Sequence, residues 1–338
     1  MERFVIGAAI LAAVAIAAGG YFGHAISDGD GFRFVINGES EAGGSVTKGG
    51  GAPSNVPAAA YAGRELKVRN AVARLTVIPE DRSDIALEIV NPGTLPTPTV
   101  RLEGDEVVVD GGIANRRIRN CEGAGDQFTV TVNGVGDVSA AQAPRITARV
   151  PRAVAVAVSG GVESEIGPSS SADLLFSGCG DARVGDVAGD LDVSASGSGD
   201  LKVGAAQSAS VSMSGSGAAV VGAVAQKLDV SLSGSGGVTV AAANGPVEVA
   251  IAGSGDVAID GGSMGDADVS IAGSGGVTLG GDVQSLDVSI AGSGDVEVRG
   301  KAAALDASIM GSGDVTVAAV SGRVEKAVMG SGKVQVGP

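Results

Sequence analysis

The chain has 338 residues, of which 57 are glycine and 2% are aromatic, and its net charge is −15. This acidic balance argues against binding to nucleic acid, whose phosphates require Lys and Arg, and against binding to anionic membrane surfaces. A chain of this length can bury a large core, and elongated repeat folds are not bound by the usual domain size.

Residues 1–26 are predicted to enter a membrane. After Met1–Arg3 the sequence is apolar from Phe4 to Gly23, a length that just spans a bilayer. The alternative is a cleaved signal peptide, for which Ala15–Ala17 offers a small-x-small cleavage site. Both alternatives export the rest of the chain, which is then either anchored in the inner membrane and facing the periplasm, or secreted.

Two segments precede the repeats described below. Residues 27–60 are rich in Gly, Ser and Pro and are predicted to form a flexible tether. Residues 61–158 form a different β region, interpreted as irregular first coils or as a small β cap that protects an open sheet edge. Alternating apolar residues between turn signals predict its strands at 65–77, 84–90, 106–109, 127–132 and 145–150.

Residues 159–338 carry a regular repeat. The tripeptide Gly-Ser-Gly occurs eight times between Gly197 and Gly330, at steps of 18 to 20 residues. Gly178-Cys179-Gly180 lies 19 residues before the first and is a further copy, and Ser159-Gly160-Gly161 is a decayed one. A fixed period of this size is typical of a repeat architecture.

Each repeat predicts one coil of a solenoid. A strand such as 228–232 precedes the Gly-Ser-Gly turn and a shorter one such as 238–240 follows it, both with alternating apolar residues. We therefore expect an all-β, right-handed parallel β-helix with coils of about 19 residues. An antiparallel sandwich is the alternative, but it does not require the same residue types in the same columns. The turn serines are expected to form a hydrogen-bonded ladder from coil to coil.

The repeat resembles a known bacterial family. The runs at Ser196–Asp200, Gly292–Val298 and Gly311–Val317, with the segment Leu75–Asp81, resemble the auto-transporter adhesin head GIN-domain proteins, a domain of unknown function. The resemblance covers roughly residues 60–338 and implies a right-handed β-helix in an exported protein. It brings no catalytic residues, and this chain shows no autotransporter barrel.

The two cysteines, Cys121 and Cys179, are a candidate disulfide. An even number of cysteines in an exported chain permits one bridge, which would contribute on the order of 4 kcal/mol in the chain-entropy model. The alternative is two unpaired thiols. Two cysteines with a single histidine give little support to a zinc site.

The outward position of the first strand in each repeat is acidic in seven copies. If the coils stack in register, these carboxylates form a stripe with a spacing of about 4.8 Å. The stripe either serves solubility or binds a cation weakly or a basic partner. Its members are Asp192, Asp229, Glu248, Asp268, Asp287, Asp306 and Glu325.

No catalytic, cofactor or metal site is expected. The sole histidine, His24, has no partner for acid-base chemistry. Paired carboxylates could serve a glycosidase, but no aromatic residue follows Phe176 to bind a sugar. We expect a non-enzymatic, exported cell-envelope protein with an adhesin-like surface for an unidentified protein or an envelope glycan. A periplasmic, membrane-anchored structural or sensing scaffold is the alternative, and a polysaccharide-acting enzyme is less favoured.

The C-terminal end of the repeats leads to two opposite expectations. An open solenoid end is an exposed sheet edge, which can pair end to end with another copy. Lys333 and Pro338 are the residues expected to discourage such pairing.

Overall fold

The computed structural model describes residues 53–337, which form two compact units. One unit comprises residues 53–188 and 195–202, and the other comprises residues 189–194 and 203–337. The predicted membrane segment, residues 1–26, and the tether up to residue 52 lie outside the described residues. The described part contains no helix that is long and apolar enough to cross a membrane.

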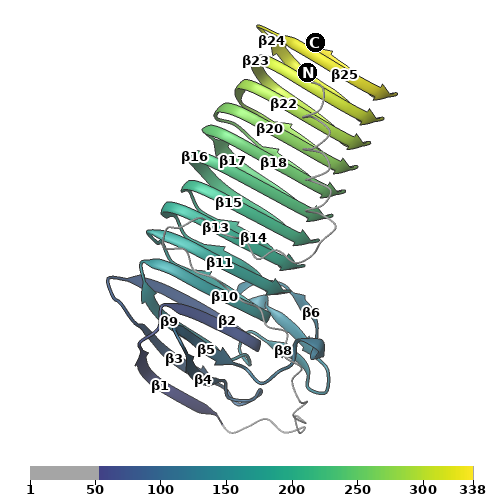
Figure 1. Cartoon of the computed structure of the whole chain (residues 1–338). Coiled ribbons are helices and arrows are strands. Elements are labelled where there is room, and N and C mark those ends of the chain that lie inside the picture. The colour runs from purple at the N-terminus through teal and green to yellow at the C-terminus, as the bar shows by residue number, and fades with distance from the viewer. Residues whose placement is uncertain (1–52, 338) are drawn as a thin grey trace. The chain divides into compact units, whose positions relative to one another are not determined.

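Residues 203–337 form a parallel β-solenoid (Figure 1). Each coil has a long strand that ends at the first glycine of the corner and a short strand that follows it. The long strands are β15 (Ala206–Gly215), β18 (Gly245–Gly253), β20 (Ser263–Gly273), β22 (Asp282–Gly292) and β25 (Val324–Gly330). The short strands are β17 (Gly237–Ala243), β19 (Asp256–Ile259), β21 (Gly276–Leu279), β24 (Val315–Val320) and β26 (Val334–Val336). Two strands, β16 (Ala218–Gly234) and β23 (Asp295–Gly311), run through both parts of a coil.

Consecutive long strands pair in parallel and in register. Val230 on β16 lies opposite Val249 on β18, which lies opposite Val269 on β20. All three side chains are buried, with at most 1% of their surface exposed. The repeat therefore stacks identical β-branched residues into one continuous core, which favours strands over helices. The predicted β-solenoid is confirmed, the antiparallel sandwich is excluded for these coils, and the right-handed winding of the coils stays a prediction.

The glycines of the corner are required by close approach of the coils. Gly253 has a φ of +135°, and a Cβ there would lie 2.3 Å from the carbonyl oxygen of Gly234 in the coil before. Backbone groups hold the corner, as Ser254 N donates to Gly234 O at 2.9 Å. The predicted ladder of serine hydroxyls is found in the described coils for one pair only, Ser312 and Ser331, at 3.0 Å. The corner is therefore held by backbone hydrogen bonds, in which the first glycine of one corner, such as Gly234, turns its carbonyl toward the next coil.

The unit of residues 53–188 is built around β2 (Glu65–Glu80), which pairs in parallel with three strands. These are β5 (Glu106–Asp110), β9 (Arg145–Pro151) and β10 (Ala153–Ile166), and β10 pairs onward with β11 (Ser171–Gly178) and β12 (Ala182–Val184). The strands β13 (Val187–Gly197) and β14 (Leu201–Val203) have residues in both units. Parallel coils therefore occur within residues 61–158 as well, the region interpreted from the sequence as irregular first coils or a small β cap.

The register locates the corners of these early coils. Gly160 lies opposite Gly178, so the decayed copy is Gly160-Gly161-Val162, one residue later than expected. Gly160 also lies opposite Ala71 on β2, next to Asn70. Asn70 is the one non-glycine residue with positive φ, +51°, in the described part of the chain. Asn tolerates the left-handed conformation, so β2 turns its corner without a glycine.

Antiparallel strands complete this unit. β1 (Ser54–Tyr61) pairs with β3 (Ile85–Asn91), β3 pairs with β9, and β4 (Thr99–Glu103) pairs with β5. The tether boundary predicted at residue 60 lies inside β1. The register of β1 shifts between Val56 and Ala59, around Pro57. Proline is tolerated in an edge strand at such an irregularity. The Pro content that suggested a tether is therefore compatible with a strand here.

Residues 111–144 form an insertion between β5 and β9. Its strands β6 (Ile118–Glu122), β7 (Thr129–Val132) and β8 (Gly136–Ser139) make a separate antiparallel sheet, flanked by the 3-10 turns η1 (Asn115–Arg117) and η2 (Gly125–Gln127). A small core joins this sheet to β2 through Val72 and includes Phe128, Val130, Val132 and Val138. Only β7 is predicted from the sequence, because the insertion has no repeat period.

Candidate interaction surface

The solenoid stacks the predicted acidic residues in one column. Successive pairs in the register are Asp229 with Glu248, Glu248 with Asp268, Asp268 with Asp287, Asp287 with Asp306, and Asp306 with Glu325. Ser210 lies opposite Asp229 and interrupts the column, and Asp192 is exposed on β13. We call Asp229, Glu248, Asp268, Asp287, Asp306 and Glu325 the acidic ladder.

The carboxylates at the two ends of the acidic ladder form ion pairs with Lys or Arg side chains. Lys227 Nζ lies 2.8 Å from Asp229 Oδ2. At the other end, Arg323 lies 3.4 Å from Glu325 and 4.0 Å from Asp306. These ion pairs are exposed, so each contributes little to stability. Their effect is to limit the uncompensated charge to the middle of the ladder.

Glu248, Asp268 and Asp287 form this middle. No Lys or Arg of the described residues lies within 4 Å of their carboxylates. Burial raises the pKa of Asp268. Burial also raises the pKa of Asp287, and the carboxylates of Asp268 and Asp306 raise it further. Like charges stacked on neighbouring strands destabilise one another, so a bound cationic group would relieve this repulsion.

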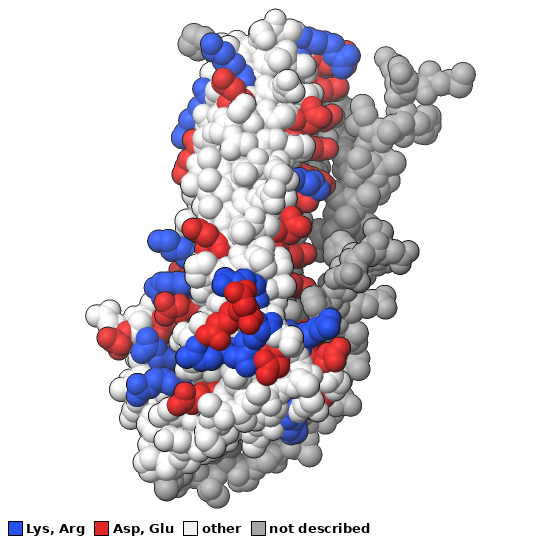
Figure 2. Space-filling view, turned by 90° about the vertical axis from the view of Figure 1, so that its left-hand side faces the viewer, with Lys and Arg blue, Asp and Glu red and all other residues white. Residues whose placement is uncertain are grey.

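The residues beside the acidic ladder are small. Two positions after each acidic residue, the register stacks serine and alanine, namely Ser231, Ala250, Ser270, Ser289, Ser308 and Ala327. Figure 2 shows Asp and Glu side chains along one edge of the solenoid. This face offers hydroxyls and carboxylates in a regular row, with no bulky side chain to obstruct an extended partner.

Metal binding by a preformed site has no support among residues 53–337. No three His, Cys, Asp or Glu side chains come together there as a metal-ligand set. Calcium takes six to eight oxygen ligands, while the acidic ladder supplies one carboxylate per coil. Weak cation binding at the ladder therefore stays a prediction.

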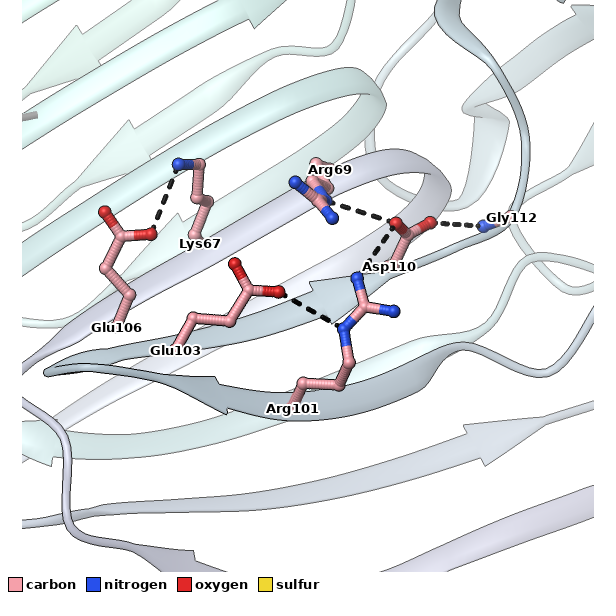
Figure 3. Close-up of polar contacts among 7 residues, drawn as sticks. All are labelled: Lys67, Arg69, Arg101, Glu103, Glu106, Asp110 and Gly112. Carbon is pink, nitrogen blue, oxygen red and sulfur yellow. Dashed lines mark hydrogen bonds and ion pairs between the residues drawn. The ribbon is translucent and has the colours of Figure 1, made fainter. Parts of the chain in front are cut away.

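In the other unit, charges on the outer face of β2, β5 and β4 are paired (Figure 3). Lys67 Nζ lies 3.2 Å from Glu106, and Arg69 Nε lies 3.1 Å from Asp110. Arg101 contacts Glu103 at 3.2 Å and Asp110 at 3.7 Å. Asp110 Oδ1 also accepts a hydrogen bond from Gly112 N at 3.0 Å. This network neutralises its own carboxylates, so it offers less to a cationic partner than the middle of the acidic ladder.

Glu65 is a buried acid beside this network. It is 7% exposed and lies opposite Glu106 in the register. Burial raises the pKa of its carboxyl, and Glu106, Asp173 and Asp105 raise it further. The alternation of β2 did not mark Glu65 as buried, because it occupies an outward position in the strand.

Cys121 and Cys179 form a disulfide, with their Cα atoms 5.5 Å apart. Cys121 lies on β6 of the insertion, and Cys179 occupies the serine position in the corner after β11. Next to them, a Cβ on Gly161 would lie 3.2 Å from Cys121 Sγ and 3.0 Å from Val130. The insertion thus lies directly against the corners of β10 and β11.

Glu163 is a second link that sequence analysis missed. Its side chain is 8% exposed, 3.2 Å from Arg74 Nε and 3.4 Å from Arg183. It also accepts a hydrogen bond from the backbone N–H of Gly125 on η2. Two arginines and one amide stabilise the buried charge, so Glu163 joins the insertion to β2, β10 and β12.

A family model matches residues 141–263 and 230–337, together more than half of the chain. No curated protein is detectably similar to this chain. Among solved structures, a "putative lipid binding protein" from Parabacteroides distasonis is 15% identical with a TM-score of 0.44, covering 86% of this chain and 98% of its own. A "putative adhesin" from the same species is 16% identical with a TM-score of 0.41, at 85% and 98% coverage. A "putative adhesin" from Parabacteroides merdae is 16% identical with a TM-score of 0.40, covering 86% of this chain and 98% of its own. On the match of the family model, the chain belongs to the family described as "Putative auto-transporter adhesin, head GIN domain".

Proposed function

We propose that the protein is a non-enzymatic, exported cell-envelope protein that presents its solenoid face as an adhesin-like binding surface. The family description supports the adhesin class. The observation that carries the proposal is the middle of the acidic ladder, where Glu248, Asp268 and Asp287 stack with no Lys or Arg of the described residues within 4 Å. The partner is a basic region of a protein or an envelope glycan, held by charge and by the adjacent serine hydroxyls.

The binding test uses two triple variants with the same change of charge. The first replaces the middle of the ladder by Glu248→Gln, Asp268→Asn and Asp287→Asn. The control replaces Asp256, Asp295 and Asp314 by Asn, which keeps their oxygens as hydrogen-bond acceptors. Binding of a decalysine peptide is measured by interferometry at two salt concentrations, because screening weakens exposed charge pairs.

We expect the ladder variant to lose at least about tenfold in affinity for decalysine, or about 1.4 kcal/mol, while the control stays close to the unchanged protein. Equal losses in both variants would show that binding follows net charge and not the ladder. Calcium is tested separately, by melting temperature. No shift at millimolar calcium would remove the cation-binding alternative.

The cellular test separates the adhesin from a periplasmic structural or sensing scaffold. A protease site is inserted at Gly49–Gly51, the C-terminus is tagged, and cells are treated before and after the outer membrane is opened. Release from intact cells supports the adhesin. Release only after opening supports the scaffold, anchored in the membrane by residues 1–26. Turnover of any envelope glycan would overturn the non-enzymatic assignment.

A further inference from the structure

Lys326 occupies a position that is apolar in the coils before it. On β25 it lies opposite Ala307 of β23, which lies opposite Val288 of β22. Val288 and Ala307 are fully buried, and the column continues back through Val269. The pleat therefore directs Lys326 toward the interior side of the coil, where a charge is unexpected.

The side chain of Lys326 crosses the end of the coil. Its Nζ donates a hydrogen bond to the backbone oxygen of Val334 at 2.9 Å, and Val334 belongs to β26, the second strand of the same coil. Ala307 beneath it carries a methyl group where Val288 carries a branched side chain, which leaves room for the lysine methylenes. Lys326 is itself exposed, and a lysine can lay its methylenes along an apolar surface while its ammonium stays hydrated.

The last described coil, formed by β25 and β26, exposes apolar side chains along β25. Val324 and Val328, whose counterparts Leu305 and Ile309 are buried, are 37% and 39% exposed, and Met329 is 67% exposed. An open edge with apolar side chains is a template for pairing with another strand. A second copy presents the same edge, and two such edges are self-complementary about a twofold axis.

We propose that Lys326 protects the exposed edge of β25 and prevents a second copy from pairing with it edge to edge. A paired edge would bury the ammonium and bring two of them close together, and an uncompensated buried charge is costly. Inward-pointing charges on edge strands are an established protection against such pairing. The structure thus assigns to Lys326 the role that the sequence suggested for Lys333. Lys333 instead follows Asp314 in the column of residues after the corners, where its backbone N–H donates to Asp314 Oδ1.

The test is cross-linking of the full chain in mild detergent. Ala327→Cys places a thiol at the centre of β25, close to the expected twofold axis, and a short bis-maleimide joins two copies whose edges pair. Cys121 and Cys179 are joined in a disulfide, so the introduced cysteine is the thiol that reacts with the bis-maleimide. Lys326→Val restores the residue of the inner coils, and Lys326→Ala is a second variant in case the first folds poorly.

We expect covalent dimer to increase at least tenfold in the Lys326→Val and Lys326→Ala backgrounds. Lys326→Arg and Lys333→Val should match the unchanged chain, and Ser270→Cys, in the same column but within the solenoid, should give no dimer with either residue at 326. The proposal is overturned if neither Lys326 variant gains dimer while circular dichroism shows intact β structure. It is also overturned if the chain with Lys326 unchanged already cross-links fully through Ala327→Cys.

Discussion

Asp295 and Asp314 are linked across two coils: Asp295 Oδ1 accepts a hydrogen bond from the backbone N–H of Asp314 at 2.8 Å. The same bond joins Asp314 to Lys333 and Asp256 to Gly276, each at 2.8 Å. Aspartate after a glycine turn is expected to bond amides of its own turn, whereas here it reaches the equivalent residue of the next coil. These carboxylates therefore contribute to stacking, which explains their recurrence at one position.

We predict that Asp295→Ala lowers the free energy of unfolding by about 1 kcal/mol, the net contribution of one hydrogen bond. Asp295→Asn should stay close to the unchanged protein, because the amide oxygen can accept the same bond. Asn244 already does so, with its Oδ1 3.1 Å from Ser263 N. Urea unfolding of both variants measures the difference. Equal losses for Ala and Asn would assign the effect to charge and not to the acceptor.

Gly253 at a corner and Gly261 between β19 and β20 differ in what a side chain would meet, which gives a matched pair of substitutions. We predict that Gly253→Ala destabilises the protein by about 2 kcal/mol or more, because it combines an unfavourable φ with a backbone clash. Gly261→Ala should stay within about 0.5 kcal/mol, since a Cβ there has no atom within 4 Å. Thermal unfolding compares the two. Similar losses at both positions would mean that chain flexibility, and not coil approach, requires the glycines.

Much of the solenoid is predictable from the sequence because each repeat places the same residue types at the same step. Leu228 and Asp229 recur as Leu286 and Asp287, and the register pairs them through the intervening coils. The period thus predicts both the core columns and the acidic column. It also contains the signal for Lys326, since Glu325-Lys326-Ala327 aligns with Asp306-Ala307-Ser308.

Contacts made outside the period could not be predicted. Glu163 follows a corner, as Asp181 does in the next coil. Its partner Arg74, however, is 89 positions away in a region without repeats. The insertion strands β6 and β8 are short and mostly polar on their exposed face. Tertiary packing against Val72 decides their structure, and periodicity carries no information about such long-range contacts.

The acidic ladder gives a prediction for pH. The pKa of Asp287 is raised in the folded state by burial and by its acidic neighbours. The folded state therefore prefers the protonated form of Asp287. Protonation stabilises the fold fully at pH values below the ordinary pKa of Asp, about 3.9, and this stabilisation is lost as the pH rises through the raised pKa of the folded state. We predict that Asp287→Asn raises the melting temperature at pH 7 and that this gain disappears in acid.

The expected gain at pH 7 is about 0.5 kcal/mol, the scale for like charges on neighbouring strands, and added salt should reduce it. The control is Asp229→Asn, which removes an ion pair with Lys227 and should bring no gain. Melting curves between pH 3 and pH 8 record both variants. A gain for Asp287→Asn that is independent of pH would exclude charge repulsion as its cause.

The disulfide allows a substitution that restores the repeat. Cys179→Ser creates the Gly-Ser-Gly of the later coils, so it removes the cross-link without changing the corner. We predict a loss of about 2–4 kcal/mol in the free energy of unfolding, as for other disulfides of long loops. Cys121→Ser should cost a similar amount, and the double variant should cost no more than either single one, because the two residues form one bond. Additive losses would show that each cysteine acts by its own packing. If the bond alone is responsible, a reducing agent should lower the stability of the unchanged protein by the same amount and leave both variants unaffected.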